Sequence, residues 1–279
     1  MDDQNTTERL KQSVKDYWNK TPLLSESIAA TPGTPEFFAE FDAVRESKAD
    51  VRDYESAIHR FDCFAGKHVL DVGCGNGWLL MKYASKGALV TGVDITEKAI
   101  ELTKRRFDMA GIPAELKVSD AENLPFQDAS FDLVTSTGVL HHTPNTEAGI
   151  REVSRVLRPG GTAIIMLYHK NSAQYWWAMT YYRWKAFIKT GKLPSRQEMI
   201  NWTDGKGNPL GKAYTRQQVT SMTEPYFERV KIEVWELRPC MLPIPLFGDR
   251  LSRKLPKRWL SVLSNYIGWY IYAICTKRS

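Results

Sequence analysis

The sequence predicts an α/β protein with a mostly parallel sheet of seven strands, helices on both faces of the sheet and a helical cap. Apolar runs near residues 69–72, 88–94 and 114–120 have the composition of buried parallel strands. Residues 78–86 and 96–110, which separate them, have helical character. Strands and helices therefore alternate along the chain, which is the pattern of a parallel sheet.

The stretch VLDVGCGNG, residues 69–77, joins the first strand to a helix through three closely spaced glycines. Gly73, Gly75 and Gly77 let the backbone turn tightly and approach a bound molecule. Nucleotide-like ligands bind at such a junction. The third glycine of a dinucleotide-binding loop would fall at Trp78, and no Gly-Lys-Ser/Thr follows as in a P-loop, so both of these loops are excluded. An incidental tight turn is the structural alternative.

An acidic residue, Asp94, also ends the second strand. A carboxylate at this place can accept hydrogen bonds from both ribose hydroxyls of an adenosine. Ile95, the next residue, could cover one face of the adenine. The alternative is that Asp94 caps the helix over 96–110, because Asp and Thr are both good caps, and the two roles are compatible.

Together with Asp71, the glycine loop reads D-x-G-x-G-x-G and resembles motif I of the class I S-adenosylmethionine-dependent methyltransferases. The resemblance implies a Rossmann-like fold and S-adenosyl-L-methionine (SAM) as cofactor, with Asp71 facing the methionine ammonium and the glycines making room for that tail. It also implies that Asp120 meets the adenine amine and the backbone of Ala121 meets a ring nitrogen. The FDLV strand and the VLRPGG turn extend the resemblance, which covers about residues 67–168.

The acceptor side begins after the fourth strand, DLVTST, with the segment GVLHHTPN. Enzymes that methylate nucleobase amines tend to carry Asn/Asp-Pro-Pro-Tyr/Phe here, so the segment argues against that class. His141 and His142 occupy it instead, and an imidazole can take the proton that a hydroxyl or ammonium acceptor loses near neutral pH. By resemblance to small-molecule members of the family, His141 pairs with Tyr17 and is preferred to His142. His169, at the end of the fifth strand, is the third candidate. The alternative is that one of the adjacent histidines only orders the turn.

No metal is predicted from the sequence. An ion shared by the three histidines would need carboxylates among them, and the sequence shows none. The four cysteines are far apart and lack metal-ligand spacing. Separated cysteines, and a polar, acidic amino-terminal segment unlike a signal peptide, favour a cytoplasmic location.

The chain divides into four predicted parts. These are an amino-terminal helical cap or lid, residues 1–66; a SAM-binding core, 67–168; a helical insertion or lid, 169–225; and carboxyl-terminal strands that complete the sheet around a basic insertion, 226–279. The first part is expected to contain helices over 8–19 and 35–64. The last is expected to contain strands over 226–237 and 266–276, paired antiparallel at one edge.

The formal net charge of +6 is concentrated at the carboxyl end, because residues 250–279 hold seven Lys and Arg and no Asp or Glu. No stripe of Arg interleaved with aromatic residues runs through the core, so nucleic acid is not predicted as a partner. An aromatic helix over 170–190 and a basic segment over 250–263 could instead contact an anionic bilayer. The alternatives are a lid over the substrate and a solvated basic helix. Residues 259–276 are too short and too often interrupted by polar residues to span a membrane.

These patterns predict methyl transfer from SAM to a small, apolar or lipid-like metabolite. Oxygen is the favoured acceptor atom, with nitrogen and carbon left open. A SAM-binding protein that has lost catalysis and serves as a scaffold is the alternative from a different class, because the glycine loop, Asp94 and Asp120 establish binding rather than turnover. The sequence gives no indication of the oligomeric state.

Overall fold

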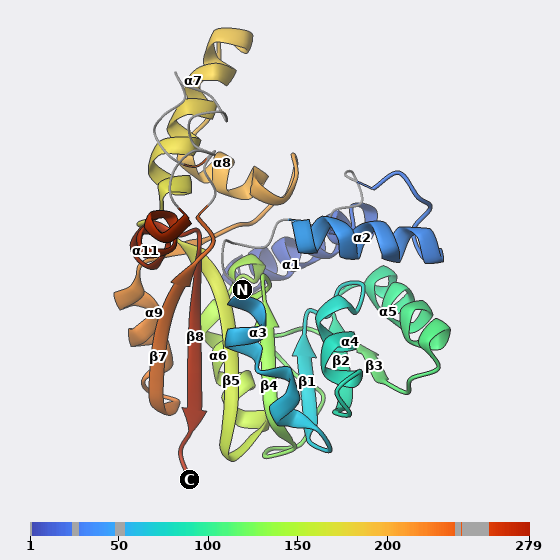
Figure 1. Cartoon of the computed structure of the whole chain (residues 1–279). Helices are drawn as coiled ribbons and strands as arrows, with labels where there is room; N and C mark the ends of the chain where they lie inside the picture. The colour runs from blue at the N-terminus through green and yellow to red at the C-terminus, as the bar shows by residue number, and fades with distance from the viewer. Residues whose placement is uncertain (1, 24–27, 48–53, 238–240, 242–256) are drawn as a thin grey trace.

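The computed structural model describes residues 2–23, 28–47, 54–237, 241 and 257–279. In this part of the chain, one eight-stranded sheet forms the centre of the molecule, with helices packed around it (Figure 1). Seven strands follow the order β3-β2-β1-β4-β5-β8-β7, and the two-residue β6 pairs with β5 off this path. The predicted α/β fold is confirmed. The short β6 was missed because two residues carry no periodicity.

The strands are β1 (His68–Val72), β2 (Leu89–Asp94), β3 (Glu115–Val118), β4 (Phe131–Thr137), β5 (Leu157–His169), β6 (Ala213–Tyr214), β7 (Phe227–Trp235) and β8 (Tyr270–Lys277). The α-helices are α1 (Asp2–Lys20), α2 (Pro35–Ser47), α3 (Tyr54–His59), α4 (Trp78–Ala84), α5 (Glu97–Ala110), α6 (Thr146–Val156), α7 (Met179–Thr190), α8 (Arg196–Asn201), α9 (Arg216–Thr223) and α11 (Lys257–Ile267). Single turns form η2 (Phe61–Phe64), η3 (Leu140–His142), η4 (Gln174–Ala178) and η5 (Trp202–Asp204).

The strand order reverses beside β1. This strand pairs in parallel with both β2 and β4, so the chain builds one half of the sheet out to β3 and then returns to the other side of β1. A switch point of this kind opens a crevice at the carboxyl ends of the strands, where α/β sheets bind ligands. β8 lies antiparallel between β5 and β7, which confirms the predicted antiparallel pair. The second strand of that pair begins at Tyr270 rather than 266, because α11 continues to Ile267.

Alternate side chains of the central strands pack on opposite faces of the sheet. Val69 and Leu133 belong to a core that includes residues of α3, α4 and α5. Leu70 and Val134 belong to a second core that includes residues of α6 and α9. The period of two along each strand therefore holds helices on both faces and leaves the strand ends free to form a site.

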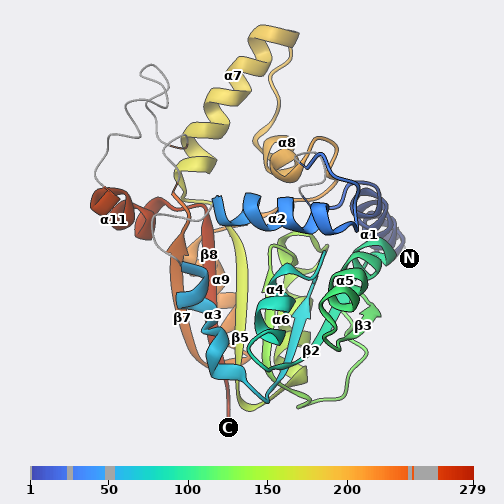
Figure 2. The same cartoon turned by 45° about the vertical axis from the view of Figure 1, so that its right-hand side comes forward.

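Helices α1 and α2 lie across the carboxyl ends of the strands (Figures 1 and 2). Phe37 and Phe41 of α2 are buried in the first core. α1 is tied to the start of α5, because Lys15 Nζ lies 2.6 Å from Glu97 Oε1 and the Asn19 amide donates to the same carboxylate. The amino-terminal helices therefore cover the crevice of the switch point.

The prediction of a single helix over 35–64 is wrong. α2 ends at Ser47, and a separate short helix spans Tyr54–His59. Arg60 then adopts a left-handed conformation with φ of 44°, which a continuing α-helix does not allow. The helical hydrophobic pattern of the sequence gives no sign of this break, which is why it predicts one helix.

After β5 the chain leaves the sheet through the π-helical turn η4 and enters α7, which stands away from the rest of the molecule in both views (Figures 1 and 2). It returns through α8, η5 and a loop to β6, where Lys170 N donates to Tyr214 O. The returning segment passes the carboxyl end of β5 and so reaches the crevice.

Candidate active site

A cavity lies at the carboxyl ends of β1, β2 and β4, covered by α1 and α2. One end of it is formed by most of the residues predicted to bind the cofactor, which are Asp71, Gly73, Gly75, Asp94, Ile95, Asp120 and Ala121. Gly77 is not part of this lining. It begins α4 with φ of 78°, and a Cβ there would lie 2.9 Å from Thr103 Cγ2, so this glycine serves the turn and its packing.

The glycines of the loop are needed for different physical reasons. Gly73 has φ of 81°, and a Cβ on it would lie 2.1 Å from Val139 Cγ2, so both backbone and packing require glycine. Gly75 has φ of 58°, and a Cβ there would meet nothing within 4 Å. The loop therefore leaves open space at Gly75, which is one of the residues lining the cavity.

The carboxylate of Asp94 is held by its own neighbours. Its Oδ1 accepts from the backbone N of Thr96 at 3.0 Å and from the Thr96 hydroxyl at 2.8 Å, and its Oδ2 accepts from Gly75 N at 3.1 Å. Burial raises the pKa of Asp94, and these hydrogen bonds oppose the rise. The α5 cap is Thr96, whose hydroxyl accepts from Ala99 N, so Asp94 is not the helix cap. A carboxylate offers about four acceptor positions, which leaves about one on Oδ2 for a ligand.

Asp71 is 2% exposed and lines the cavity at the end of β1. Burial raises the pKa of Asp71 to about 8, and the negative charge of Asp94 contributes to the rise. A cationic group in the cavity would stabilise the ionised form of this carboxyl. The site thus favours a positively charged ligand group beside Asp71.

Asp120 forms an ion pair with Lys11 of the amino-terminal helix α1. Lys11 Nζ of α1 lies 2.6 Å from Asp120 Oδ2 and 2.8 Å from Glu122 Oε2. Burial lowers the pKa of Lys11, but the bonds to the two carboxylates outweigh it, so the pKa is raised. An adenine amine at Asp120 would therefore lie beside an ammonium that also fastens α1.

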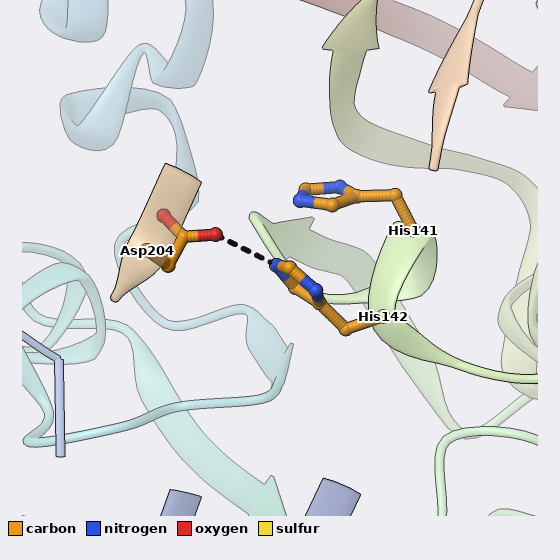
Figure 3. A group of neighbouring side chains, drawn as sticks. All are labelled: His141, His142 and Asp204. Atoms are coloured by element: carbon orange, nitrogen blue, oxygen red, sulfur yellow. Dashed lines mark ion pairs between the residues drawn. The ribbon is translucent and has the colours of Figure 1, made fainter. Parts of the chain in front are cut away.

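The other end of the cavity holds a polar group made by His142 and Tyr168, which are buried, and Asp204, which is half-buried. His142 Nε2 lies 3.0 Å from Asp204 Oδ2, the contact drawn in Figure 3. His142 Nδ1 lies 2.5 Å from the carbonyl oxygen of Leu210 and can donate to it. The Tyr168 hydroxyl donates to Asp204 Oδ2, and burial beside that carboxylate raises the pKa of Tyr168 well above its ordinary value. The imidazole is therefore fixed with Nε2 directed at the carboxylate.

The preference for His141 is corrected by its position. Its side chain is 0% exposed, and within the described residues it contributes no surface to the cavity. Its ring packs between those of His142, with centroids 4.2 Å apart, and Tyr168, with centroids 3.9 Å apart. Burial and the charge of His142 lower the pKa of His141 well below its ordinary value, and the Met166 carbonyl acts in the opposite direction. Of the two adjacent histidines, His142 is the one that lines the cavity.

The other two candidates lie outside the cavity lining. His169 Nδ1 is 3.0 Å from the Gly268 carbonyl, and burial lowers the pKa of His169, so this side chain joins β5 to the turn before β8. The Tyr17 hydroxyl donates to the backbone oxygen of Asp204 at 3.1 Å rather than pairing with His141. The adjacent Trp18 lines the cavity and packs edge-on against His142.

Sequence reasoning missed Asp204, Tyr168 and Lys11. Asp204 belongs to the Gly- and Asn-rich segment 201–212, which has no periodicity and no spacing that relates it to the histidines. Tyr168 directly precedes His169 in β5, and the period of two would have indicated that the neighbours face opposite ways. Lys11 had no signal in the sequence, because only the packing of α1 over β3 brings it to Asp120.

The cavity combines carboxylates at the ends of neighbouring parallel strands with the polar group of His142, Tyr168 and Asp204. A family model described as a methyltransferase domain matches residues 70–165. The chain is 31% identical over 176 residues to a ubiquinone biosynthesis O-methyltransferase of Dechloromonas aromatica, a match that covers 57% of this chain and 76% of the relative. It is 34% identical over 119 residues to the Chromobacterium violaceum protein of the same name, covering 42% of this chain and 51% of that relative.

Solved structures share the fold. The [4+2]-cyclase SpnF aligns with a TM-score of 0.57 at 17% identity, covering 96% of this chain and 97% of its own. A Haemonchus contortus N-methyltransferase, in complex with phosphomonomethylethanolamine and S-adenosylhomocysteine, aligns with a TM-score of 0.55 at 19% identity, covering 81% of this chain and 53% of its own.

This chain belongs to the class I SAM-dependent methyltransferases, and its cofactor is SAM. The residues present fit that molecule: Gly75 leaves open space, Asp71 favours a cation, and Asp94 keeps an acceptor position. When bound, SAM supplies an electrophilic methyl group.

Proposed function

We propose that this methyltransferase methylates an oxygen atom of a small acceptor that carries a hydroxyl group on an apolar or lipid-like body. The observation that carries the proposal is the pair of buried His142 and half-buried Asp204 at the end of a cavity with aromatic walls. The similarity to O-methyltransferases of ubiquinone biosynthesis supports oxygen as the acceptor atom.

The walls of the cavity favour an apolar acceptor. Aromatic and apolar side chains from α2, α4, β5 and β8 form them, and these are Phe37, Phe41, Trp78, Leu79, Met166 and Tyr270. Burying a ring or an alkyl chain against such walls stabilises binding by roughly 25 cal/mol per Å² of apolar surface removed from water. Polar groups line the cavity at His142, Tyr168 and Asp204 and also at the Arg45–Glu55 ion pair beside Trp78. In the proposed function, the acceptor hydroxyl lies at the first of these two places.

His142 and Asp204 provide the place for the proton that a hydroxyl loses. His142 Nε2 faces Asp204 Oδ2 and Nδ1 faces the Leu210 carbonyl, so a proton given up by the acceptor can be shared between the imidazole and the carboxylate. Both residues line the cavity, where an acceptor hydroxyl can reach the pair. Tyr168 holds Asp204 in place through its hydroxyl.

Methyl transfer from labelled SAM to matched phenols tests this proposal. Each phenol is compared with its methyl ether, and a short alkyl substituent is compared with a long one. We expect transfer to the free hydroxyl and a lower KM for the longer chain. Transfer to amines but not to phenols would overturn the choice of oxygen. SAM binding without turnover on phenol, amine or carbon acceptors would favour the scaffold alternative.

We further propose that the helical insertion, residues 169–225, contacts a membrane surface peripherally. The exposed side chains near and on α7 are those common at bilayer interfaces, and they are Trp176, Trp177, Tyr181, Tyr182, Trp184, Phe187 and Ile188. Trp259 and Tyr266 of α11 are also exposed, at 66% and 67%. Among the helices described, none has both the length and the hydropathy of a membrane span.

The charge of the insertion suits an anionic surface. The stretch 171–195 contains no Asp or Glu, and its basic residues are Arg183, Lys185, Lys189 and Lys192. Each Lys or Arg close to an anionic bilayer contributes about 1 kcal/mol to binding. Residues 250–256 of the basic segment predicted over 250–263 lie outside the described residues, so α7 carries this proposal.

Flotation with vesicles tests membrane contact. We expect binding to anionic vesicles, weakening with added salt because the lysines act through a screened field. Ile188→Ser, at a side chain that is 83% exposed, should reduce flotation, whereas Met109→Ser on α5, at 52% exposed, provides the matched control. Equal flotation with neutral and anionic vesicles would contradict the charge argument. If sedimentation shows a dimer that Ile188→Ser disrupts, α7 is an interface between copies of this chain rather than a membrane contact.

A further inference from the structure

We propose that His141, His142 and Asp204 bind one divalent transition-metal ion at the acceptor end of the cavity. One possible ligand atom from each of these residues lies within 4.8 Å of the other two. Figure 3 shows the two imidazoles and the carboxylate gathered around one point. The role of such an ion in catalysis rests on the proposed function, but its binding does not.

The contact between His142 and Asp204 is of a kind that a bound cation would stabilise. With Nδ1 donating to the Leu210 carbonyl, Nε2 presents a lone pair toward Asp204 Oδ2, 3.0 Å away. Two lone pairs cannot face each other at this distance without a proton or a metal ion between them. A histidine ligand whose second nitrogen donates to a backbone carbonyl is the usual arrangement around a protein-bound metal.

His141 gives the second, independent observation. It is fully buried, and within the described part of the chain neither ring nitrogen makes a hydrogen bond of standard geometry, although the Met166 carbonyl acts on the ring. Leaving a buried polar atom without a good hydrogen bond is unfavourable, so a buried imidazole in this state calls for an explanation. A metal ion bound by one of its nitrogens would supply that reason, and His142 and Asp204 lie beside it.

The donor set indicates which ion. Two imidazoles and one carboxylate suit Zn²⁺ and neighbouring ions such as Co²⁺ or Mn²⁺ better than Ca²⁺ or Mg²⁺. Three protein ligands leave at least one coordination position, and His142 and Asp204 line the cavity, so that position can face the acceptor oxygen. Tyr168 donates to Asp204 and would form part of the outer shell. The positive charge of Lys212 opposes binding, but its ammonium is bound to the carbonyls of Thr143 and Pro144.

Metal binding can be measured on the whole chain without SAM or acceptor. After removal of metals with a chelator, the protein is titrated with Zn²⁺ by calorimetry and with Co²⁺ by visible absorption. We expect one equivalent of Zn²⁺ per chain and d–d bands of a Co²⁺ ion bound to nitrogen and oxygen. His141→Phe, which keeps an aromatic ring between His142 and Tyr168, should weaken binding by about 100-fold or more, because loss of an outer-shell partner alone costs 10–100-fold. His169→Phe is the matched control and should bind as the wild type.

The outcomes separate this inference from the proposed function. A wild-type chain that binds none of Zn²⁺, Co²⁺ or Mn²⁺ in stoichiometric amount overturns the metal site. So does a His141→Phe variant that binds like the wild type while SAM calorimetry shows that it is folded. If His141→Phe loses metal binding but transfers methyl groups as the wild type does, the metal site is real but has no role in the reaction. Methyl transfer that fails on every hydroxyl acceptor, with the metal bound, would instead contradict the proposed function alone.

Discussion

The two ends of the cavity are built in different ways. At the cofactor end, Asp71, Asp94 and Asp120 lie at or just beyond the ends of β1, β2 and β3, neighbours in one parallel sheet. At the acceptor end, His142 comes from η3 and Asp204 from η5, a segment that returns from an excursion of the chain. The first end depends on strand register, and the second on loops held by side-chain hydrogen bonds. Substitutions should therefore separate the two functions, binding of SAM and turnover.

The largest effect is expected at the acceptor end. His142→Ala should lower kcat about 10²–10⁴-fold, because it removes the imidazole that faces the acceptor, while the affinity for SAM stays nearly unchanged. Steady-state kinetics and SAM calorimetry measure the two quantities. His169→Ala is the control, since that ring binds the Gly268 carbonyl away from the cavity. Full kcat in His142→Ala would indicate that the acceptor atom is sulfur or an activated carbon rather than oxygen.

The next effect concerns the cofactor end. Asp94→Ala should weaken SAM binding by about 1.5–3 kcal/mol, the value of a hydrogen bond to a charged group. Asp94→Asn should recover part of the loss, because the amide oxygen still accepts from Thr96 or Gly75. Calorimetry at constant pH provides the comparison. Unchanged SAM affinity in Asp94→Ala would show that Asp94 only accepts hydrogen bonds from Gly75 and Thr96 and does not bind the cofactor.

Asp71 makes stability depend on pH. Its folded pKa of about 8 lies above its ordinary value of 3.8, so between these two values the folded state binds more protons than the unfolded state. Its contribution to the free energy of unfolding therefore falls as pH rises through this window, by up to about 1.4 kcal/mol per pH unit. Asp71→Asn should remove that slope. Denaturant titrations of both proteins across the window give the difference, and parallel curves would contradict the raised pKa.

The smallest effect concerns the helix that covers both ends. Lys11→Ala should free α1 from Asp120 and Glu122, with a cost of roughly 1 kcal/mol for a partly exposed ion pair. Hydrogen exchange of residues 2–20 should quicken while the amides of the central strands keep their protection. Arg9→Ala, at an exposed position of the same helix, serves as the control. Equal exchange in the two variants would mean that the contacts of Lys15 and Asn19 suffice to hold α1.

The sequence predicted the core better than its surroundings. The apolar runs of β1, β2 and β4 predict strands buried on both faces, and the burial of Val69, Leu70 and Leu133 agrees with this. The break at Arg60 was missed, because a left-handed residue other than glycine leaves no mark in the hydrophobic pattern. The exposure of Trp177 and Tyr181 was equally beyond the pattern, since a stripe of aromatic residues describes a buried face and a projecting one alike.

The sequence by itself determined the cofactor end, because the order of strands in a parallel α/β sheet brings successive strand ends to one edge and the glycine loop to the first of them. Only the tertiary structure decided the acceptor end. It placed His142 rather than His141 at the cavity and brought Asp204 to it across a long stretch of chain. The physical reason is that residues 201–212 have no repeating geometry, and their position follows from hydrogen bonds such as those of Tyr17 and Leu210, which form only in the folded chain.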